Sequence, residues 1–118
     1  MNITIVGTNK NIAYVQGEGP IITNAQSALD LMATVHYETG CSRIIIDKIS
    51  VAEDFFKLSS CLAGEILQKY INYHIKLAII GDYSSHTSKS LKDFIYESNR
   101  GKDFLFVSTV DEAIERLS

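Results

Sequence analysis

The residues best able to do chemistry follow a short apolar run, Lys76–Ile80, in the C-terminal half of the chain. Asp82 and His86 are of the types that serve as general acids and bases, and amide groups ahead of a following helix can bind an anion. An ordinary loop, with Thr87 or Ser88 as a helix cap, explains the same residues. We favour that explanation over direct catalysis, but we expect the loop to form a binding surface. The residues predicted for it are Asp82, Tyr83, Ser84, His86 and Thr87.

A second set of polar residues follows another apolar run, Arg43–Asp47. Among the carboxylates Asp47, Glu53, Asp54 and Asp82, the pair Asp47 and Asp82 ends neighbouring strands and could do acid–base work or hold a divalent metal ion. Helix capping and exposure at strand ends explain these carboxylates more simply. We therefore predict no metal site and no cofactor, and we assign Glu53 and Asp54 to the binding surface.

The three histidines do not form a metal-binding pattern, because none of them stands four residues from another. His36 falls on the small-residue side of a helical stripe, and we expect it in the core or at an interface. His74 follows a predicted helix, where a cation suits the helix dipole. His86 alone lies in a strand-to-helix loop and is the best acid–base candidate if the chain is an enzyme.

Hydrophobic periodicity predicts nine elements. Residues 1–6, 12–16, 43–47, 77–80 and 104–107 are β-branched, aromatic or continuously apolar, as strands are. Four stripes at helical spacing predict helices. Their expected bounds are 24–39 with Thr23 or Asn24 as N-cap, 54–72, 87–98, and a last helix that begins with the capping box Thr109–Glu112.

One glycine and one arginine stand out within these helices. Gly64 costs its helix about 1 kcal/mol relative to alanine, so we expect close packing or a subunit interface there. Arg100 could hold a carboxylate or phosphate, although a solvated helix end explains it equally well. The stripe of the first helix is Ala25, Ala28, Leu29, Met32 and Ala33.

The order of these elements is β-β-α-β-α-β-α-β-α. Strands that alternate with helices form a mostly parallel sheet with right-handed crossovers, and the opening hairpin adds an antiparallel edge strand. We therefore predict one α/β domain over residues 1–118. Loops at the carboxyl ends of parallel strands meet at one edge of the sheet. That edge collects Asn24, residues 53–60 and residues 82–87.

Composition limits the classes of function. The chain is 46% hydrophobic and 21% charged with a formal net charge of −3, which is typical of a folded domain and gives no basic surface for nucleic acid. No apolar run is long enough to enter a bilayer, and residues 1–6 resemble a strand more than a signal peptide. Cys41 and Cys61, expected to be unreactive small hydrophobes, suit a reducing cytoplasm. We find no catalytic triad, phosphate loop or dinucleotide-binding turn.

Several segments resemble a bacterial family catalogued as domain of unknown function 4180. The likeness covers nearly the whole chain, but it implies no chemistry. The similar pieces are Gln26–Met32, Phe55–Phe56, Ala63–Tyr70, Asn72–Tyr73, Leu77–Asp82, Ser88–Leu91 and Asp93–Asn99.

The element order also resembles the STAS fold of anti-sigma factor antagonists, as does the ending Phe106–Ala113. This resemblance implies a binding switch in which a serine ahead of a helix is phosphorylated. The STAS pattern Asp-Ser-Ser-Gly is nearest to Leu58–Cys61, where both serines are present and Leu and Cys replace Asp and Gly. Ser59 and Ser60 are therefore the predicted phosphorylation sites.

These observations favour a non-catalytic module of bacterial regulation that binds another protein or a small ligand. Two alternatives remain. One is a small hydrolase-type enzyme that uses Asp82 and His86 with Asp47, and the other is a homodimer built through one helix face.

Overall fold

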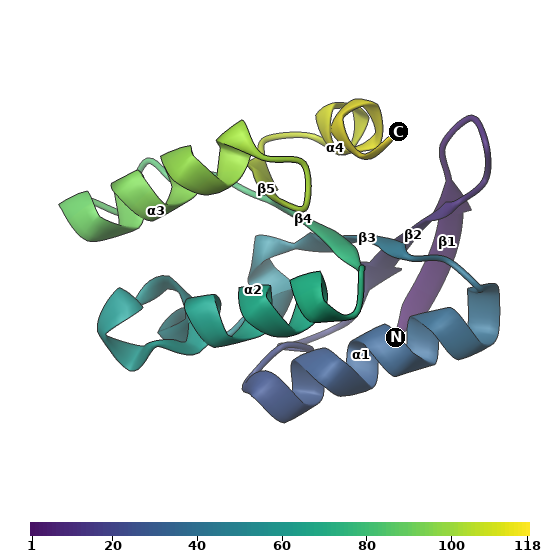
Figure 1. Ribbon diagram of the computed structural model, residues 1–118, viewed down its shortest axis with the longest axis horizontal. Helices are drawn as coiled ribbons and strands as arrows, with labels where there is room; N and C mark the ends of the chain where they lie inside the picture. The colour runs from purple at the N-terminus through teal and green to yellow at the C-terminus, as the bar shows by residue number, and fades with distance from the viewer.

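The computed structural model describes all residues, 1–118, and contains one five-stranded sheet. The strands are β1 (Asn2–Val6), β2 (Ile12–Gln16), β3 (Arg43–Asp47), β4 (Lys76–Ile80) and β5 (Phe104–Val107), in the spatial order β1-β2-β3-β4-β5 (Figure 1). β1 runs antiparallel to β2, and the other neighbours are parallel. The predicted fold class and element order are confirmed.

Four α-helices cover this sheet: α1 (Ala25–Thr39), α2 (Leu62–Asn72), α3 (Lys89–Arg100) and α4 (Val110–Leu117). Figure 1 shows α1 and α2 below the sheet and α4 above it, while α3 lies beside β5. None of the helices is long and apolar enough to cross a bilayer.

The sheet is buried on both sides, because the three middle residues of β3 and of β4 are all apolar and buried. Successive side chains of a strand point to opposite faces. Ile44 and Ile46 accordingly join the larger core cluster, under α1 and α2, whereas Ile45 joins the smaller one, under α4. These strands are therefore apolar in their middle residues because both faces of the sheet are covered, as is typical of parallel strands.

Local capping fixes where the helices begin and end. The Asn24 side chain accepts a hydrogen bond from Ser27 N, and Gly40 ends α1 in the left-handed conformation at φ 73°. Ser88 caps α3, which starts two residues later than predicted, and Thr109 caps α4. Three of the four helix starts therefore lie at residues that the sequence marked.

The predicted second helix is wrong at its N-terminal end. Residues 48–60 form three 3₁₀ turns, Lys48–Ser50, Glu53–Phe56 and Leu58–Ser60, and α2 begins only at Leu62. Phe55 and Leu58 are three residues apart, a spacing that suits a 3₁₀ turn as well as an α-helix. Cys61 then takes a left-handed conformation, φ 63°, which no continuous helix allows.

Three further expectations are corrected by burial. His36 is exposed and not in the core, because α1 buries Leu31 and Val35 where the predicted stripe had Leu29 and Ala33; its placement at an interface stays a prediction. Gly64 is exposed, and a Cβ atom there would meet nothing within 4 Å, so close packing does not explain it. Of the two cysteines, Cys41 is buried but Cys61 is exposed, and both are free.

Candidate functional site

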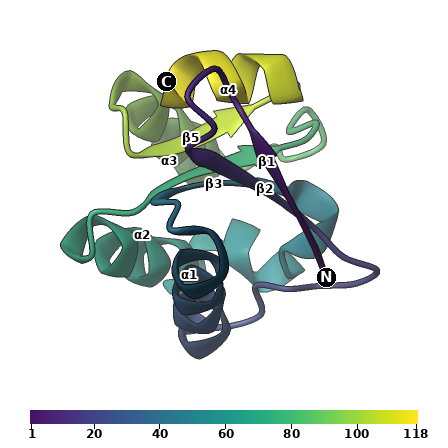
Figure 2. The same ribbon diagram turned by 90° about the vertical axis from the view of Figure 1, so that its right-hand side faces the viewer.

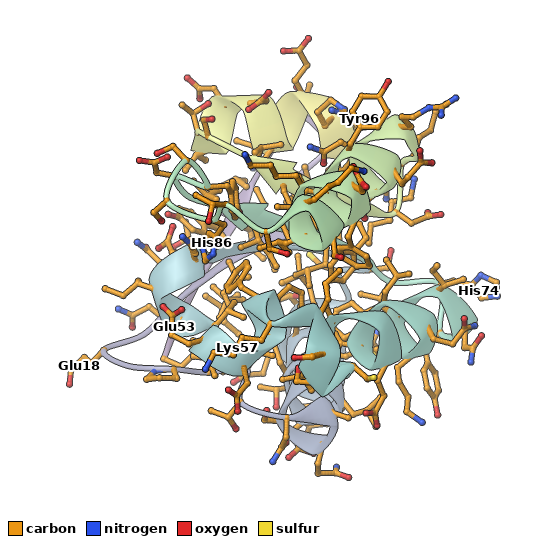
Figure 3. The ribbon with its side chains drawn as sticks, turned by 90° about the vertical axis from the view of Figure 1, so that its left-hand side faces the viewer. Glu18, Glu53, Lys57, His74, His86 and Tyr96 are labelled. Atoms are coloured by element: carbon orange, nitrogen blue, oxygen red, sulfur yellow. The ribbon has the colours of Figure 1, made fainter.

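Three loops meet at the carboxyl ends of the parallel strands, as the element order predicts. We call residues Asn24, Glu53–Ser60 and Asp82–Thr87 the carboxyl-end surface. The segment before α1 joins the loop after β3 through a parallel bridge between Ile22 and Val51, and Ala52 N donates to Ile22 O at 2.8 Å. Figure 3 shows Glu53, Lys57 and His86 together at one end of the molecule and His74 at the other.

Lys48 ties the loop after β3 to the loop after β4. Its Nζ donates to the Asp82 carbonyl oxygen at 2.8 Å. The same ammonium lies 5.4 Å from the centre of the Phe56 ring and 5.3 Å from that of Tyr83, within the range of cation–π attraction. Gly81 makes room for it, because a Cβ atom there would lie 2.6 Å from Lys48 Cβ. The Lys48 ammonium thus contacts the Asp82 carbonyl and the rings of Phe56 and Tyr83, and we call this arrangement the Lys48 clamp.

Asp82 is held as an anion by its own loop. Its Oδ1 accepts a hydrogen bond from Ser84 N at 2.9 Å. That bond, together with Ser84's side chain and the Lys48 charge, lowers the pKa of the Asp82 carboxyl below its ordinary value. A carboxylate held in this way accepts hydrogen bonds readily but is a poor proton donor near neutral pH.

The imidazole of His86 packs on the Phe56 ring, with 5.2 Å between ring centres and 25° between planes. Its Nε2 is buried and has no hydrogen-bond partner. No hydrogen bond or ion pair joins His86 to Asp82 or Asp47. The structure therefore brings the three acid–base candidates to one region without linking them as a catalytic set.

Asp47 instead pairs with Tyr14 on the neighbouring strand. Tyr14 OH donates to Asp47 Oδ1 at 2.8 Å. Burial, followed by this hydrogen bond and the carboxylate charge, raises the pKa of Tyr14 to about 12. Tyr14 therefore stays protonated well above neutral pH and keeps donating this hydrogen bond.

A cavity of about 540 Å³ opens between the loops after β3 and β4. Its lining is mixed, with three carboxylates, the Lys48 side chain and the strongly exposed Ile49. No three His, Cys, Asp or Glu side chains converge as metal ligands anywhere in the chain. The lining residues are Pro20, Asp47, Lys48, Ile49, Val51, Ala52, Glu53, Ile80, Gly81 and Asp82.

The two predicted phosphorylation sites differ in their surroundings. Ser60 Oγ lies 2.7 Å from the carbonyl oxygens of both Asp54 and Lys57, and it accepts from Leu62 N at 3.3 Å. Ser59 is exposed, and its hydroxyl makes no hydrogen bond. Ser60 thus closes the turn ahead of α2, whereas Ser59 is free.

The remaining predicted residues vary in how free they are. The Asn24 side chain is occupied in capping α1. Asp54 forms an exposed ion pair with Lys57 at 3.8 Å. Glu53 and Thr87 are exposed and make no side-chain hydrogen bond. Tyr83 is half-buried, its OH donates to Ile79 O at 2.6 Å, and burial raises its pKa.

Two residues organise this surface, and sequence reasoning missed Lys48 and included Phe56 only as part of the range 53–60. A usable signal existed for Lys48. Asp47 is paired with Ile80 across β3 and β4, so alignment of the two strand ends sets Lys48 beside Gly81. Phe56 was assigned to a helix, and the 3₁₀ turn that aims its ring toward Tyr83 has no clear sequence mark.

A larger cavity, about 700 Å³, is lined by α1 from Gln26 to His36 and by the turn from α2 to β4. His36, Tyr73 and His74 contribute to its wall. Gln26 donates to Asp30 at its rim, at 2.9 Å, so this polar pair is already satisfied. Neither of the two residues with an unpartnered buried side-chain atom, Ser50 and His86, lines this cavity.

Comparison with known proteins gives one match. The family model described as Domain of unknown function (DUF4180) covers residues 7–117. The chain belongs to this family. Among curated proteins and among solved structures, no match was found. The family prediction made from the sequence pieces is confirmed, and it carries no assignment of activity.

Proposed function

We propose that this chain is a non-catalytic binding module of a bacterial, cytoplasmic regulatory system, similar to STAS domains, and that it binds another protein through the carboxyl-end surface. One observation carries the proposal. Only two buried side-chain polar atoms in the chain lack a hydrogen-bond partner, Ser50 Oγ and His86 Nε2. Both belong to loops at the carboxyl ends of the strands, and such orphaned groups are rare enough to need an explanation.

The chemistry of the surface indicates the kind of partner. Asp47, Glu53 and Asp82 line the cavity, and the single cation there, Lys48, is already engaged by a carbonyl and two rings. Ile49, 80% exposed, gives the rim an apolar contact. A partner segment with a basic side chain beside an apolar one complements this arrangement in charge and in polarity.

Ser59 is the better of the two candidates for a phosphorylation switch. Its hydroxyl is free, it stands three residues ahead of α2, and the α2 amides of Ala63 and Gly64 have no backbone acceptor. Cys61 supports the alignment with the STAS pattern, because its left-handed φ of 63° is the conformation that glycine adopts most easily. A phosphate there would add negative charge to an already acidic surface and change its affinity for a basic partner.

The test is differential capture from the host organism. Tagged wild type is compared with Glu53→Lys, and Glu115→Lys on α4 serves as a control with the same charge change on an exposed glutamate that makes no hydrogen bond. We expect proteins that wild type and Glu115→Lys capture and that Glu53→Lys loses. Equal capture by all three would refute the assignment of the surface.

The enzyme alternative makes a separate prediction. If Asp82 and His86 catalyse hydrolysis, hydrolase and phosphatase substrates are turned over by wild type and not by His86→Ala. The lack of any hydrogen bond between these two side chains gives this alternative less support than binding.

A further inference from the structure

The two edge strands of the sheet, β1 and β5, differ in whether other parts of the chain cover their outer backbone groups. At β5 the Asn99 side chain accepts from Phe106 N at 2.7 Å and donates to Phe106 O at 3.0 Å. Ser98 Oγ donates to Phe104 O at 2.8 Å, and Arg116 holds this helix end through Asn99 O at 2.6 Å. The end of α3 therefore seals the β5 edge against further strands.

The β1 edge has no such cover. β1 pairs only with β2, from Asn2 opposite Gln16 to Val6 opposite Ile12, so its outer backbone groups have no partner strand. Figure 2 shows β1 crossing the front of the molecule with no helix drawn over it. Proteins usually protect such an edge with lysine, proline or a bulge. β1 has none of these, and it holds no charged residue in a chain that is 21% charged.

We propose that a second copy of this chain pairs with that edge through its own β1, antiparallel about a two-fold axis at Thr4, so that one continuous sheet runs through both copies. A two-fold axis perpendicular to the sheet leaves each residue on its own face. The axis must then pass midway between two copies of the same residue, because directly opposed residues share a face. A centre at Thr4 is the one that pairs all of Asn2–Val6.

The strand is self-complementary in this register. Ile3 packs against the larger core cluster, and Ile5, which is 40% exposed, shares its face. Ile3 of each copy would lie opposite Ile5 of the other, so that four isoleucines gather on one side. On the other side Thr4 faces Thr4, and Asn2 faces Val6. Pairs of β-branched residues and of threonines are favourable across strands, and no like charges are opposed.

This inference is independent of the proposed function, because the carboxyl-end surface lies at the strand ends and the β1 edge lies along the side of the sheet. β1 also precedes the residues matched by the family model, 7–117, so the pairing is inferred for this chain and not for its family. It differs from a dimer built through a helix face.

Thiol trapping tests the register. In a Cys61→Ser background, Thr4→Cys is oxidised or treated with a short bifunctional thiol reagent, and Thr8→Cys, on the exposed hairpin loop, is the control. We expect Thr4→Cys to form covalent dimers at least ten times faster. A mixture of Asn2→Cys and Val6→Cys chains should cross-link with each other, and neither should do so alone. Equal rates for Thr4→Cys and Thr8→Cys would overturn the proposal.

Sedimentation velocity of the uncross-linked chain provides the second measurement. We expect the mass of wild type to rise toward that of a dimer with concentration, and Ile5→Lys to stay monomeric with an unchanged circular dichroism spectrum. Wild type that is monomeric at every concentration would contradict the pairing. So would a dimer that survives Ile5→Lys and is not trapped through Thr4→Cys, because such a dimer uses another surface.

Discussion

Replacement of glycine by alanine should have opposite effects on the free energy of unfolding at Gly81 and at Gly64. At Gly81 an added Cβ would lie 2.6 Å from Lys48 Cβ and 2.9 Å from its Cδ, whereas ordinary contacts begin at 3.4 Å. Lys48 must therefore move by about 0.8 Å, and because its Cβ is fixed to the backbone, the strand end must move with it. Overpacking of this kind costs about 1–3 kcal/mol. Gly81 itself has no left-handed φ, so the cost is purely one of contact.

At Gly64 the same added Cβ meets nothing within 4 Å, on an exposed position of α2. Gly64→Ala should therefore stabilise the chain by about 0.5–1 kcal/mol, through the helix preference of alanine. Urea unfolding followed by circular dichroism gives both values. Gly81→Ala should also weaken partner binding, since it displaces the Lys48 clamp. If Gly81→Ala were as stable as wild type, the close approach of Lys48 to β4 would be wrong.

Three other predictions concern single groups. Ser60→Ala should destabilise the chain by about 1 kcal/mol, because it removes the hydroxyl that forms hydrogen bonds in the turn before α2. Ser59→Ala should change stability by less than about 0.5 kcal/mol, and equal urea midpoints for the two variants would contradict this. Asn99→Ala should lower the free energy of unfolding by about 2 kcal/mol, because two hydrogen bonds to Phe106 are lost. Asn72→Ala loses one exposed hydrogen bond to Gln68 and should be nearly neutral. An Asn99→Ala variant as stable as wild type would mean that these bonds do not stabilise the β5 edge. Stability should fall as pH rises from about 10 to 12, because the pKa of Tyr14 is raised to about 12 and the unfolded chain ionises first. Tyr14→Phe should lose less stability over the same pH range, and an identical loss would refute the Tyr14–Asp47 contribution.

Strong local signals carried most of the fold. The apolar runs within residues 43–47, 76–80 and 104–107 indicate buried strands, and the helix caps Asn24, Gly40 and Thr109 lie where their side chains or backbone freedom predict. The prediction failed in residues 54–61, where Phe55 and Leu58 have a spacing shared by two kinds of helix. Only the left-handed conformation of Cys61 shows that the α-helix begins after it, and the residue type cysteine does not predict that conformation.

The sequence predicted where the candidate site lies but not which side chains contact one another within it. Strand order brings the three loops to one end, so the region followed from the element order. The clamp did not follow, because it depends on the aim of the Phe56 and Tyr83 rings toward Lys48, and those orientations are set by packing between distant segments. The core placement expected for His36 was wrong for a similar reason, since a shift of the buried stripe toward Leu31 and Val35 leaves its side chain in solvent.

The central claim is that the carboxyl-end surface binds a protein. Quantitative mass spectrometry of proteins captured from the host by wild type, Glu53→Lys and Glu115→Lys tests it most directly. We predict at least one protein that is enriched with wild type and with Glu115→Lys and lost with Glu53→Lys, and that binds again as a purified protein with the same order of affinities. Capture that is equal for all three chains, or no enriched protein at all, would contradict the account.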